Sequence, residues 1–175
     1  MAFHTGETVL YGAEGVCRIT GTERRNIAGI PMEYYILQPV FNRQSRVLVP
    51  INNRQLTEKM RRVLSSQEIY DLLRSMPSDP DLHWEENETL RQDRFKEILQ
   101  RGDRRELVGL IKTLYQHQQE LAQKGKKLHQ ADERFFKDAE KKLYEEFAHV
   151  LNIEREQVLP FILEEIRIQE RKEQE

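Results

Sequence analysis

The sequence of 175 residues predicts an α+β protein, with a small β-barrel over residues 1–62 and an all-α helical bundle over residues 63–175. The main observation is a change of hydrophobic period near residue 60. Before it, apolar residues alternate in short runs between glycine-containing turns, as they do in half-buried strands. After it, they recur every three or four positions, as on one face of a helix. The chain length also suits two small domains.

The predicted barrel begins with glycines at positions 6, 12 and 15, where a tightly curled strand can bend or take a positive φ. Three runs rich in β-branched and aromatic residues follow. They predict strands over residues 16–24, 32–39 and 46–50, with turns at Ala28-Gly29 and Asn42-Arg43. Pro50 ends the last strand, because proline cannot donate to a ladder.

The first predicted helix starts at Ser65 or Ser66, either of which can be the N-cap, and Glu68 can close a capping box on Ser65. Its expected buried stripe is Ile69, Leu72, Leu73 and Met76, and Pro77, Asp79 and Pro80 stop it. A second helix is predicted over residues 82–101 and ends at Gly102. A third runs from a capping box at Asp103 and Glu106 to about residue 123. A fourth, capped by Asp132, covers residues 132–151, and a fifth covers residues 154–173, with Pro160 near its first turns or kinking it.

Charge is unevenly distributed along a chain whose net charge is only −2. Residues 1–65 hold nine Lys/Arg against five Asp/Glu, a balance of +4, which leaves −6 for the remainder. The barrel is therefore the basic end, which weakly favours an acidic partner. Cys17 is the single cysteine, so no internal disulfide is expected. With no signal peptide or long apolar run, the expected location is cytoplasmic and no membrane partner is expected.

The residues do not form a pattern that predicts catalysis. Histidines and the cysteine lack metal-ligand spacing, and no glycine-rich phosphate loop precedes a helix. Glu146 and His149 make one Glu-x-x-His pair, but di-iron bundles need two pairs and further carboxylates, so we expect a surface pair. We therefore expect a non-enzymatic binding protein, with no catalytic residues, metal, cofactor or small-molecule substrate.

Three groups of residues are candidates for binding. Trp84, the single tryptophan, follows a double-proline segment, and both core packing and an exposed use remain open. Lys124, Lys126, Lys127, Arg134, Lys137, Lys141 and Lys142 concentrate positive charge that could meet a phosphate backbone, or could simply be a solvated helix face. Near a hairpin turn, Arg24 and Arg25, with Arg43 and Arg46, could line a barrel edge that accepts a partner strand, or could protect that edge from aggregation.

Several segments together resemble the CarD family of bacterial transcription regulators. They are FHTGETVLYGAEGVCRI at the start, EYYILQP, RVLVP, Trp84 after its proline-rich bend, and GDRRELVGLIKTLY from Gly102 to Tyr115. The resemblance covers about residues 1–150. It implies a Tudor-like, SH3-like barrel that binds the β subunit of RNA polymerase, followed by a helical domain that contacts promoter DNA upstream of the −10 element. It also implies that a tryptophan at the edge of the transcription bubble stabilises the open complex.

Carried over by position, Arg25 matches a polymerase-contacting arginine of the family, and Trp84 matches the tryptophan. The resemblance also places Arg134 near a lysine of the DNA face. A second polymerase-contacting arginine is replaced by Leu48, for which Arg46 could substitute from two residues earlier. The expected polymerase-binding residues are thus Arg25, Arg24 and Arg46. The expected DNA-binding residues are Trp84, Arg91, Arg94, Arg134, Lys126 and Lys127.

After Trp84 the chain departs from the family, because Glu85, Glu86 and Glu88 stand where basic residues are expected. Carboxylates oppose a phosphate backbone, so either Arg91 and Arg94 supply the contacts or DNA binding is weak without polymerase. The leading hypothesis is a polymerase-binding regulator of the open complex. The alternative is a protein-only adaptor with Trp84 packed. An RNA-binding module is a third possibility, which the net charge argues against. Whether transcription is raised or lowered stays open.

Overall fold

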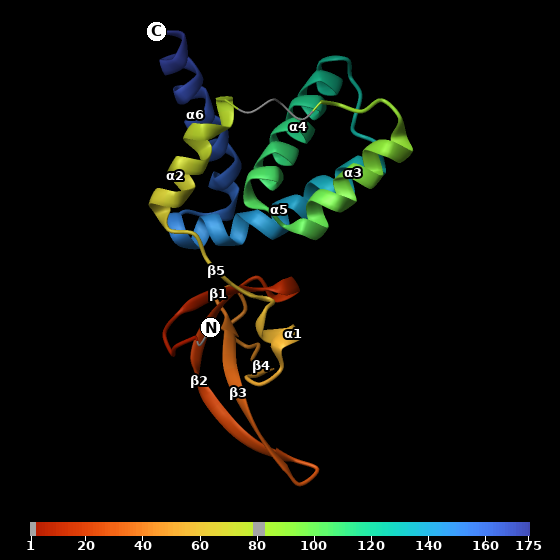
Figure 1. Ribbon diagram of the computed structural model, residues 1–175. Helices are drawn as coiled ribbons and strands as arrows, with labels where there is room; N and C mark the ends of the chain where they lie inside the picture. Colours follow the sequence, from red (N-terminus) through yellow and green to blue (C-terminus); the bar gives the residue numbers. More distant parts are fainter. Residues whose placement is uncertain (1–2, 79–82) are drawn as a thin grey trace. The chain divides into compact units, whose positions relative to one another are not determined.

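The computed structural model describes residues 3–78 and 83–175 and divides into two compact units, Met1–Leu64 and Ser65–Glu175 (Figure 1). The predicted boundary lies two residues before this division. The N-terminal unit is built from strands and the C-terminal unit from helices, so the predicted α+β class is confirmed. Each unit has its own buried apolar core and is described by itself.

The N-terminal unit is a five-stranded antiparallel sheet in the order β4-β3-β2-β1-β5. The strands are β1 (Thr8–Tyr11), β2 (Val16–Ile27), β3 (Ile30–Pro39), β4 (Val47–Pro50) and β5 (Met60–Arg62). The sheet curls around a core of Val9, Cys17, Ile19, Tyr35, Leu37, Val49 and Met60. This is the expected Tudor-like architecture. Strand β5 and two short helices, η1 (Gly12–Glu14) and α1 (Arg54–Thr57), were not predicted.

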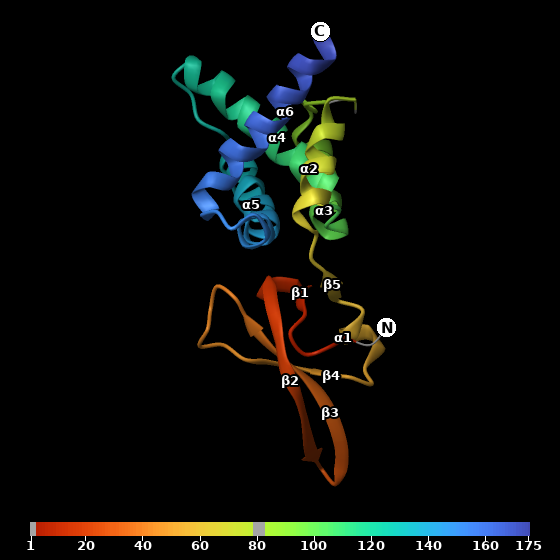
Figure 2. The same ribbon diagram turned by 90° about the vertical axis from the view of Figure 1, so that its left-hand side faces the viewer.

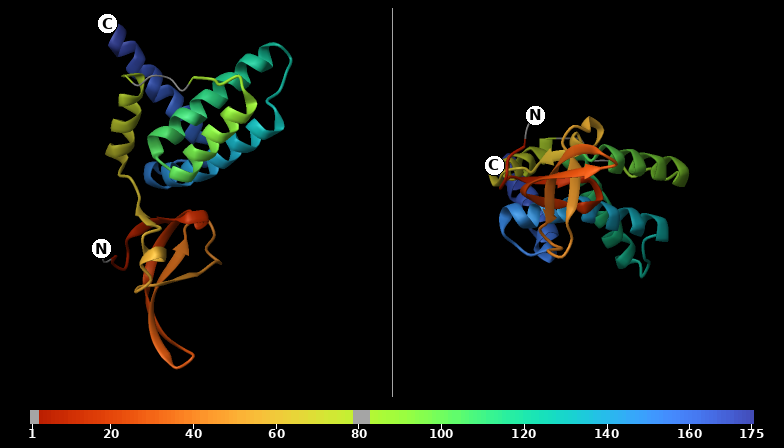
Figure 3. Two further views of the ribbon diagram at one scale, coloured as in Figure 1. Left: turned by 45° about the vertical axis from the view of Figure 1, so that its right-hand side comes forward. Right: turned by 90° about the horizontal axis from the view of Figure 1, so that it is seen from below.

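The β2–β3 hairpin extends beyond the other strands as a long curved ribbon (Figure 3). Its predicted turn at Ala28-Gly29 is confirmed: Ala28 has φ 53° and Gly29 has φ 81°. Positive φ at both central residues is typical of the type I′ turn, whose twist matches that of the flanking strands. Glycine tolerates this backbone without a steric penalty. The turn therefore fixes the register in which Ile27 faces Ile30.

The C-terminal unit consists of helices arranged around α5. The elements are α2 (Ser66–Ser75), η2 (Met76–Ser78), α3 (Glu88–Arg101), α4 (Arg104–Gln123), α5 (Gln130–Leu151) and α6 (Arg155–Gln174). Helix α5 packs against α2, α3, α4 and α6 (Figure 2). Its apolar side chains Phe136, Ala139, Leu143 and Phe147 are all buried, whereas Phe135 and Val150 are half-buried.

Helix ends agree with the predicted signals in two places. Ser65 and Glu68 form a reciprocal capping box at the start of α2, as predicted. Gly102 ends α3 in the left-handed conformation, with φ 64°, which glycine adopts at low cost. Pro160 lies inside α6, at its sixth residue, where the missing N–H removes one intrahelical bond.

Helix α3 begins at Glu88 and not at residue 82, so that prediction was wrong. The side chain of Asn87 accepts a hydrogen bond from the backbone N–H of Leu90 at 3.0 Å, which makes Asn87 the N-cap. Leu82 lies outside the described residues. Trp84 therefore precedes the helix and does not lie within it.

Two further capping predictions were wrong in part. Asp103 caps α4 through the N–H of Glu106, but the Glu106 carboxylate binds Arg101 at 2.5 Å and not the cap residue. Helix α5 begins two residues earlier than predicted, after His129, so Asp132 lies in its first turn and is not the cap. Asp132 is instead buried in an ion pair, described below.

Replacing Asn87 by alanine is expected to lower the free energy of unfolding by about 1 kcal/mol, because the N–H of Leu90 loses its side-chain acceptor. Urea unfolding monitored by circular dichroism measures this change. Gln92→Ala is the matched control, because Gln92 is a polar residue of the same helix whose side chain bonds Glu88 and not the cap. It is expected to change stability by less than about 0.5 kcal/mol. Equal midpoints for Asn87→Ala and wild type would contradict the assignment of this cap.

Candidate functional site

A β-bulge in β2 decides which side chains of the hairpin share a face. The register shifts between Ile19 and Gly21, so one extra residue is inserted opposite β3. Before the bulge, Cys17 and Ile19 point into the core. After it, odd-numbered residues of β2 point away from the core and lie beside even-numbered residues of β3. The outer face consequently gathers Glu23, Arg25, Ile27, Ile30, Met32 and Tyr34.

Two of the predicted polymerase-binding arginines meet on this face at Glu23. Arg25 Nε donates to Glu23 Oε1 at 2.9 Å, and Arg46 Nη2 bonds the other carboxylate oxygen. The Arg25 hydrogen bond is the main cause that holds the pKa of Glu23 below its usual value. Both arginine side chains remain about half exposed, at 47% and 53%. The cluster therefore presents two guanidinium groups against one carboxylate.

Arg46 lies one residue before β4. The predicted strand over residues 46–50 had placed Arg46 in the same strand as Leu48. Arg46 still reaches Glu23, twenty-three residues away in sequence, across the sheet. Leu48 pairs with Ile36, so it lies within the ladder beside the same hairpin. The structure thus places Arg46 beside Arg25 despite the substitution at Leu48.

Arg24 does not join this cluster. It alternates with Arg25 along β2 and lies opposite Glu33, so the pleat turns it to the other face of the hairpin. Arg24 therefore does not share a face with Arg25 and Arg46, although these arginines were predicted to line one barrel edge. The reason is the pleat, which sends adjacent residues of a strand to opposite faces.

The hairpin tip carries exposed apolar side chains that sequence reasoning missed. Ile27 is 51% exposed and Ile30 is 63% exposed, and the two are cross-strand neighbours next to the turn. The sequence contains a signal for this exposure, because the two isoleucines flank a two-residue turn that lies beyond the reach of the core. Together with Arg25 they form a patch of mixed apolar and basic character, which suits a protein partner.

Beside this patch, the outer edge of β2 is open within the described residues. Strand β1 pairs with β2 only at Val16, Cys17 and Arg18, and the backbone bonds from the preceding segment end at Ile19. Beyond that point, β3 is the strand that bonds β2 in the part of the chain described. An edge of this kind can accept an added strand.

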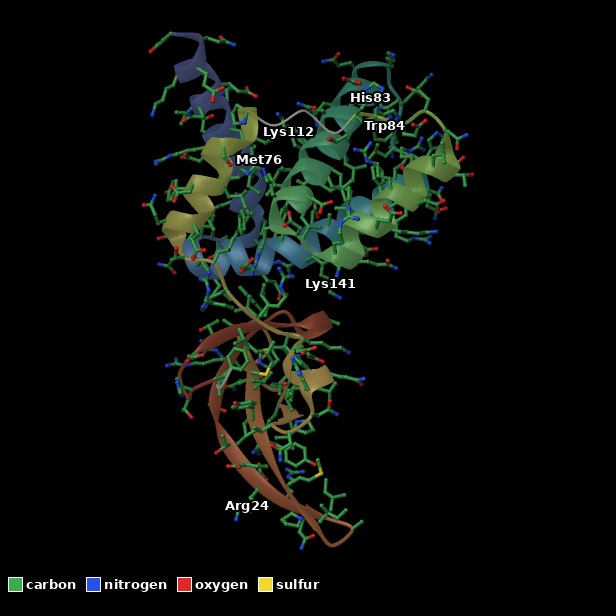
Figure 4. The ribbon with its side chains drawn as sticks, in the orientation of Figure 1. Arg24, Met76, His83, Trp84, Lys112 and Lys141 are labelled. Atoms are coloured by element: carbon green, nitrogen blue, oxygen red, sulfur yellow. The ribbon has the colours of Figure 1, made fainter. Side chains whose placement is uncertain are left out.

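Trp84 is half-buried in the helical unit and is held from three sides. The His117 ring of α4 stacks on the indole with centroids 3.7 Å apart and an interplanar angle of 15°. The Arg91 guanidinium lies 4.8 Å from the indole centroid, and Phe95 meets the indole edge-on at 6.1 Å. Figure 4 shows Trp84 lying beside α4. These contacts fix the indole in place, and the sequence did not indicate His117 as a neighbour.

Arg91 is buried, with only 5% of its surface exposed, although it was predicted to contact DNA. Its Nε and Nη2 donate to both carboxylate oxygens of Asp132 at 3.1 Å each. Its Nη1 donates to the backbone carbonyl of Glu85 at 3.0 Å. This geometry commits all three nitrogens of the side chain to the protein, so the prediction of a phosphate contact by Arg91 was wrong. Arg91 instead fastens the Trp84 segment to α5.

The other predicted DNA-binding residues are exposed and lie near this anchor. Arg94 is one turn after Arg91 on α3, and Arg134 is two positions after Asp132 on α5. Lys126 and Lys127 lie in the loop that leads into α5. The structure therefore brings Arg94, Arg134 and the lysine loop toward the end of the unit that holds Trp84. Glu86 and Glu88 are exposed at the same end and reduce its positive charge.

The Glu146–His149 pair does not lie on the surface as predicted. Glu146 is 1% exposed and binds Arg104 bidentately, at 2.9 and 2.7 Å, whereas His149 is exposed. Within residues 3–78 and 83–175, no three His, Cys, Asp or Glu side chains gather as metal ligands would. In the same described residues, no helix combines the length and apolarity needed to cross a bilayer.

Comparison with known proteins identifies one family model, which matches residues 3–64 and is described as the CarD-like/TRCF RID domain. The matched residues coincide with the N-terminal unit, and the match confirms the CarD-like resemblance there. No curated protein matches the chain. For the helical unit, the resemblance stays a prediction.

Proposed function

The N-terminal unit belongs to the CarD-like/TRCF RID domain family, whose members interact with the RNA polymerase β subunit, and from this premise we propose that the chain is a non-enzymatic transcription regulator. In this proposal the hairpin face docks on the β subunit and the helical unit contacts promoter DNA upstream of the −10 element, where Trp84 stabilises the open complex.

The observation that carries the polymerase contact is the convergence of Arg25 and Arg46 on Glu23 beside the apolar hairpin tip. Apolar side chains such as Ile27 and Ile30 supply contact area, and arginines pair with partner carboxylates. The open edge of β2 lies next to both and can take an added strand. We propose Arg25 and Arg46, with Ile27 and Ile30, as the polymerase-binding residues.

Arg25→Glu is expected to reduce recovery of the chain with purified RNA polymerase at least tenfold, because it places a second carboxylate beside Glu23 on the docking face. Pull-down with purified polymerase, quantified against wild type, measures the loss. Arg54→Glu is the matched control, since Arg54 is exposed in α1 and pairs only locally with Glu58 in the contacts described. Equal recovery of Arg25→Glu and wild type would remove the basis of the proposed docking face.

The proposed DNA contact rests on the half-buried Trp84 and the exposed Arg94, Arg134, Lys126 and Lys127 near it. The His117 ring covers one face of the indole and the Arg91 guanidinium lies 4.8 Å from its centroid, and in this proposal an edge of the indole meets the opened duplex. The exposed Glu86 and Glu88 oppose phosphate, and we propose that free duplex is bound weakly. Docking on polymerase would supply the DNA contact through high local concentration.

A protein-only adaptor is the second candidate, and the contacts of Trp84 favour it. The indole stacks on His117 at 3.7 Å and contacts Arg91. Such contacts can hold the fold together as well as position the indole for DNA. In the adaptor, the hairpin face still binds polymerase but Trp84 serves only the fold. The two functions differ in whether changing Trp84 alters the lifetime of the open complex.

A further inference from the structure

Glu23 is the least exposed of the three charged groups that meet on the hairpin face. Its side chain is 31% exposed, against 47% for Arg25 and 53% for Arg46. Arg25 Nε donates to one carboxylate oxygen of Glu23 at 2.9 Å, and Arg46 Nη2 donates to the other. Both oxygens of Glu23 are therefore bonded to guanidinium groups, and these groups are more open to solvent than the carboxylate between them.

The backbone supports the two arginines to different degrees. Arg25 follows Glu23 by two residues within β2, so the pleat of the strand places both side chains on one face. Arg46 precedes β4, and the ladder nearest to it ends at the pair of Val47 and Leu37. Because Arg46 lies outside the paired residues of the sheet, strand pairing does not fix the direction of its side chain.

The contact with Glu23 is what holds the Arg46 side chain on this face. In the part of the chain that the structure describes, Glu23 is the one hydrogen-bond and ion-pair partner of the Arg46 guanidinium. A long side chain that is free in solution loses rotamer entropy when an interface fixes it. If Glu23 fixes Arg46 in the free chain, less of this entropy is lost on docking. The Nε and Nη1 groups of Arg46 stay available to donate to a partner.

The charge of Glu23 has an opposing effect, because it repels a partner carboxylate. The Arg25 hydrogen bond is the main cause that lowers the pKa of Glu23, so Glu23 is ionised at neutral pH. A partner carboxylate nevertheless meets the arginines first, since they are the more exposed groups, and two positive charges outweigh one negative charge. The geometry therefore favours a positioning role for Glu23 over a competing one.

We propose that Glu23 is a positioning residue for polymerase binding, which holds Arg46 beside Arg25 in the free chain so that both guanidinium groups are oriented before the β subunit docks. This inference rests on the proposed function and adds to it a residue that acts through Arg46 and not by touching polymerase. Preorganisation of this kind raises affinity because fewer side chains have to be ordered on binding.

The affinity of the full chain for purified RNA polymerase, measured by biolayer interferometry at low and at moderate ionic strength, tests this role. Glu23→Ala is expected to weaken binding about threefold to tenfold at both, because Arg46 must then be ordered on docking. Glu33→Ala is the matched control, since it makes the same change of charge in the same hairpin, at an exposed residue opposite Arg24 on the other face. It is expected to leave the affinity within about twofold.

Arg46→Ala provides the background that separates positioning from a direct contact. Without Arg46, Glu23→Ala is expected to weaken binding by about twofold or less, because the two residues act as one unit and Arg25 is held by its own strand. An equal loss with and without Arg46 would overturn the proposal, and so would binding of Glu23→Ala that matches or exceeds wild type. Wild-type affinity of Arg25→Glu would instead remove the docking face itself, so the two failures are distinguishable.

Discussion

Replacing Asp132 by alanine is expected to lower the free energy of unfolding of the helical unit by about 3–5 kcal/mol. Asp132 is fully buried and accepts two hydrogen bonds from Arg91, which is 5% exposed. Its removal leaves the Arg91 charge buried without a counter-charge, and this cost is larger than the net worth of the pair itself. For a domain whose total stability is of order 5–15 kcal/mol, the loss is a large fraction.

The same change is expected to loosen Trp84. Arg91 holds the indole at 4.8 Å and the carbonyl of Glu85 at 3.0 Å, and Asp132 fixes Arg91 in that position. Urea unfolding gives the stability change, and acrylamide quenching of the single tryptophan gives its exposure. Quenching is expected to increase in Asp132→Ala before global unfolding begins.

Glu133→Ala is the matched control for Asp132→Ala, since Glu133 is the next residue of α5 but is exposed and pairs with Lys137 at 3.7 Å. It is expected to change stability by less than about 1 kcal/mol. The double variant Arg91→Met with Asp132→Leu replaces the buried pair by apolar groups and is expected to recover most of the loss. A stability of Asp132→Ala within 1 kcal/mol of wild type would contradict a buried, obligatory ion pair.

Local signals in the sequence predicted most of the architecture. Period-2 alternation located β2 to β4, and Ser65, Gly102 and the Ala28-Gly29 turn fixed boundaries that depend on short-range chemistry. Strand β5, from Met60 to Arg62, is too short to show a period and forms because β1 offers it an edge. Such an element depends on tertiary pairing, which no local pattern contains.

The candidate site was less predictable, because it depends on register and long-range pairing. The bulge between Ile19 and Gly21 sets which face Arg25 and Arg24 occupy, and a one-residue shift reverses that assignment. Arg91 was expected at the surface because arginine usually is. Its partner Asp132 is forty-one residues away, so only the packing of α3 on α5 shows that Arg91 is buried. The contact between Trp84 and His117 has the same origin.

Replacing Trp84 by alanine is expected to shorten the lifetime of the promoter open complex by about fivefold to tenfold, with recovery on polymerase unchanged. An aromatic contact with a base is worth about 1–3 kcal/mol. Because His117 already covers one face of the indole, the contact that Trp84 can make with DNA is expected to contribute a free energy in the lower part of that range. Recovery on polymerase stays constant because Arg25 and the hairpin tip belong to the other unit. Dissociation of preformed open complexes after addition of a competitor measures the lifetime.

His117→Ala tests whether the position of the Trp84 indole, and not only its presence, contributes to the lifetime of the open complex. The His117 ring stacks on Trp84 at 3.7 Å, so its loss is expected to free one indole face and to reduce the open-complex effect partially, while acrylamide quenching rises. Trp84→Phe, which keeps an aromatic ring, is expected to retain part of the lifetime. If Trp84→Ala leaves the lifetime at the wild-type value while Arg25→Glu abolishes polymerase recovery, the helical unit acts without a DNA-contacting indole and the adaptor function is correct.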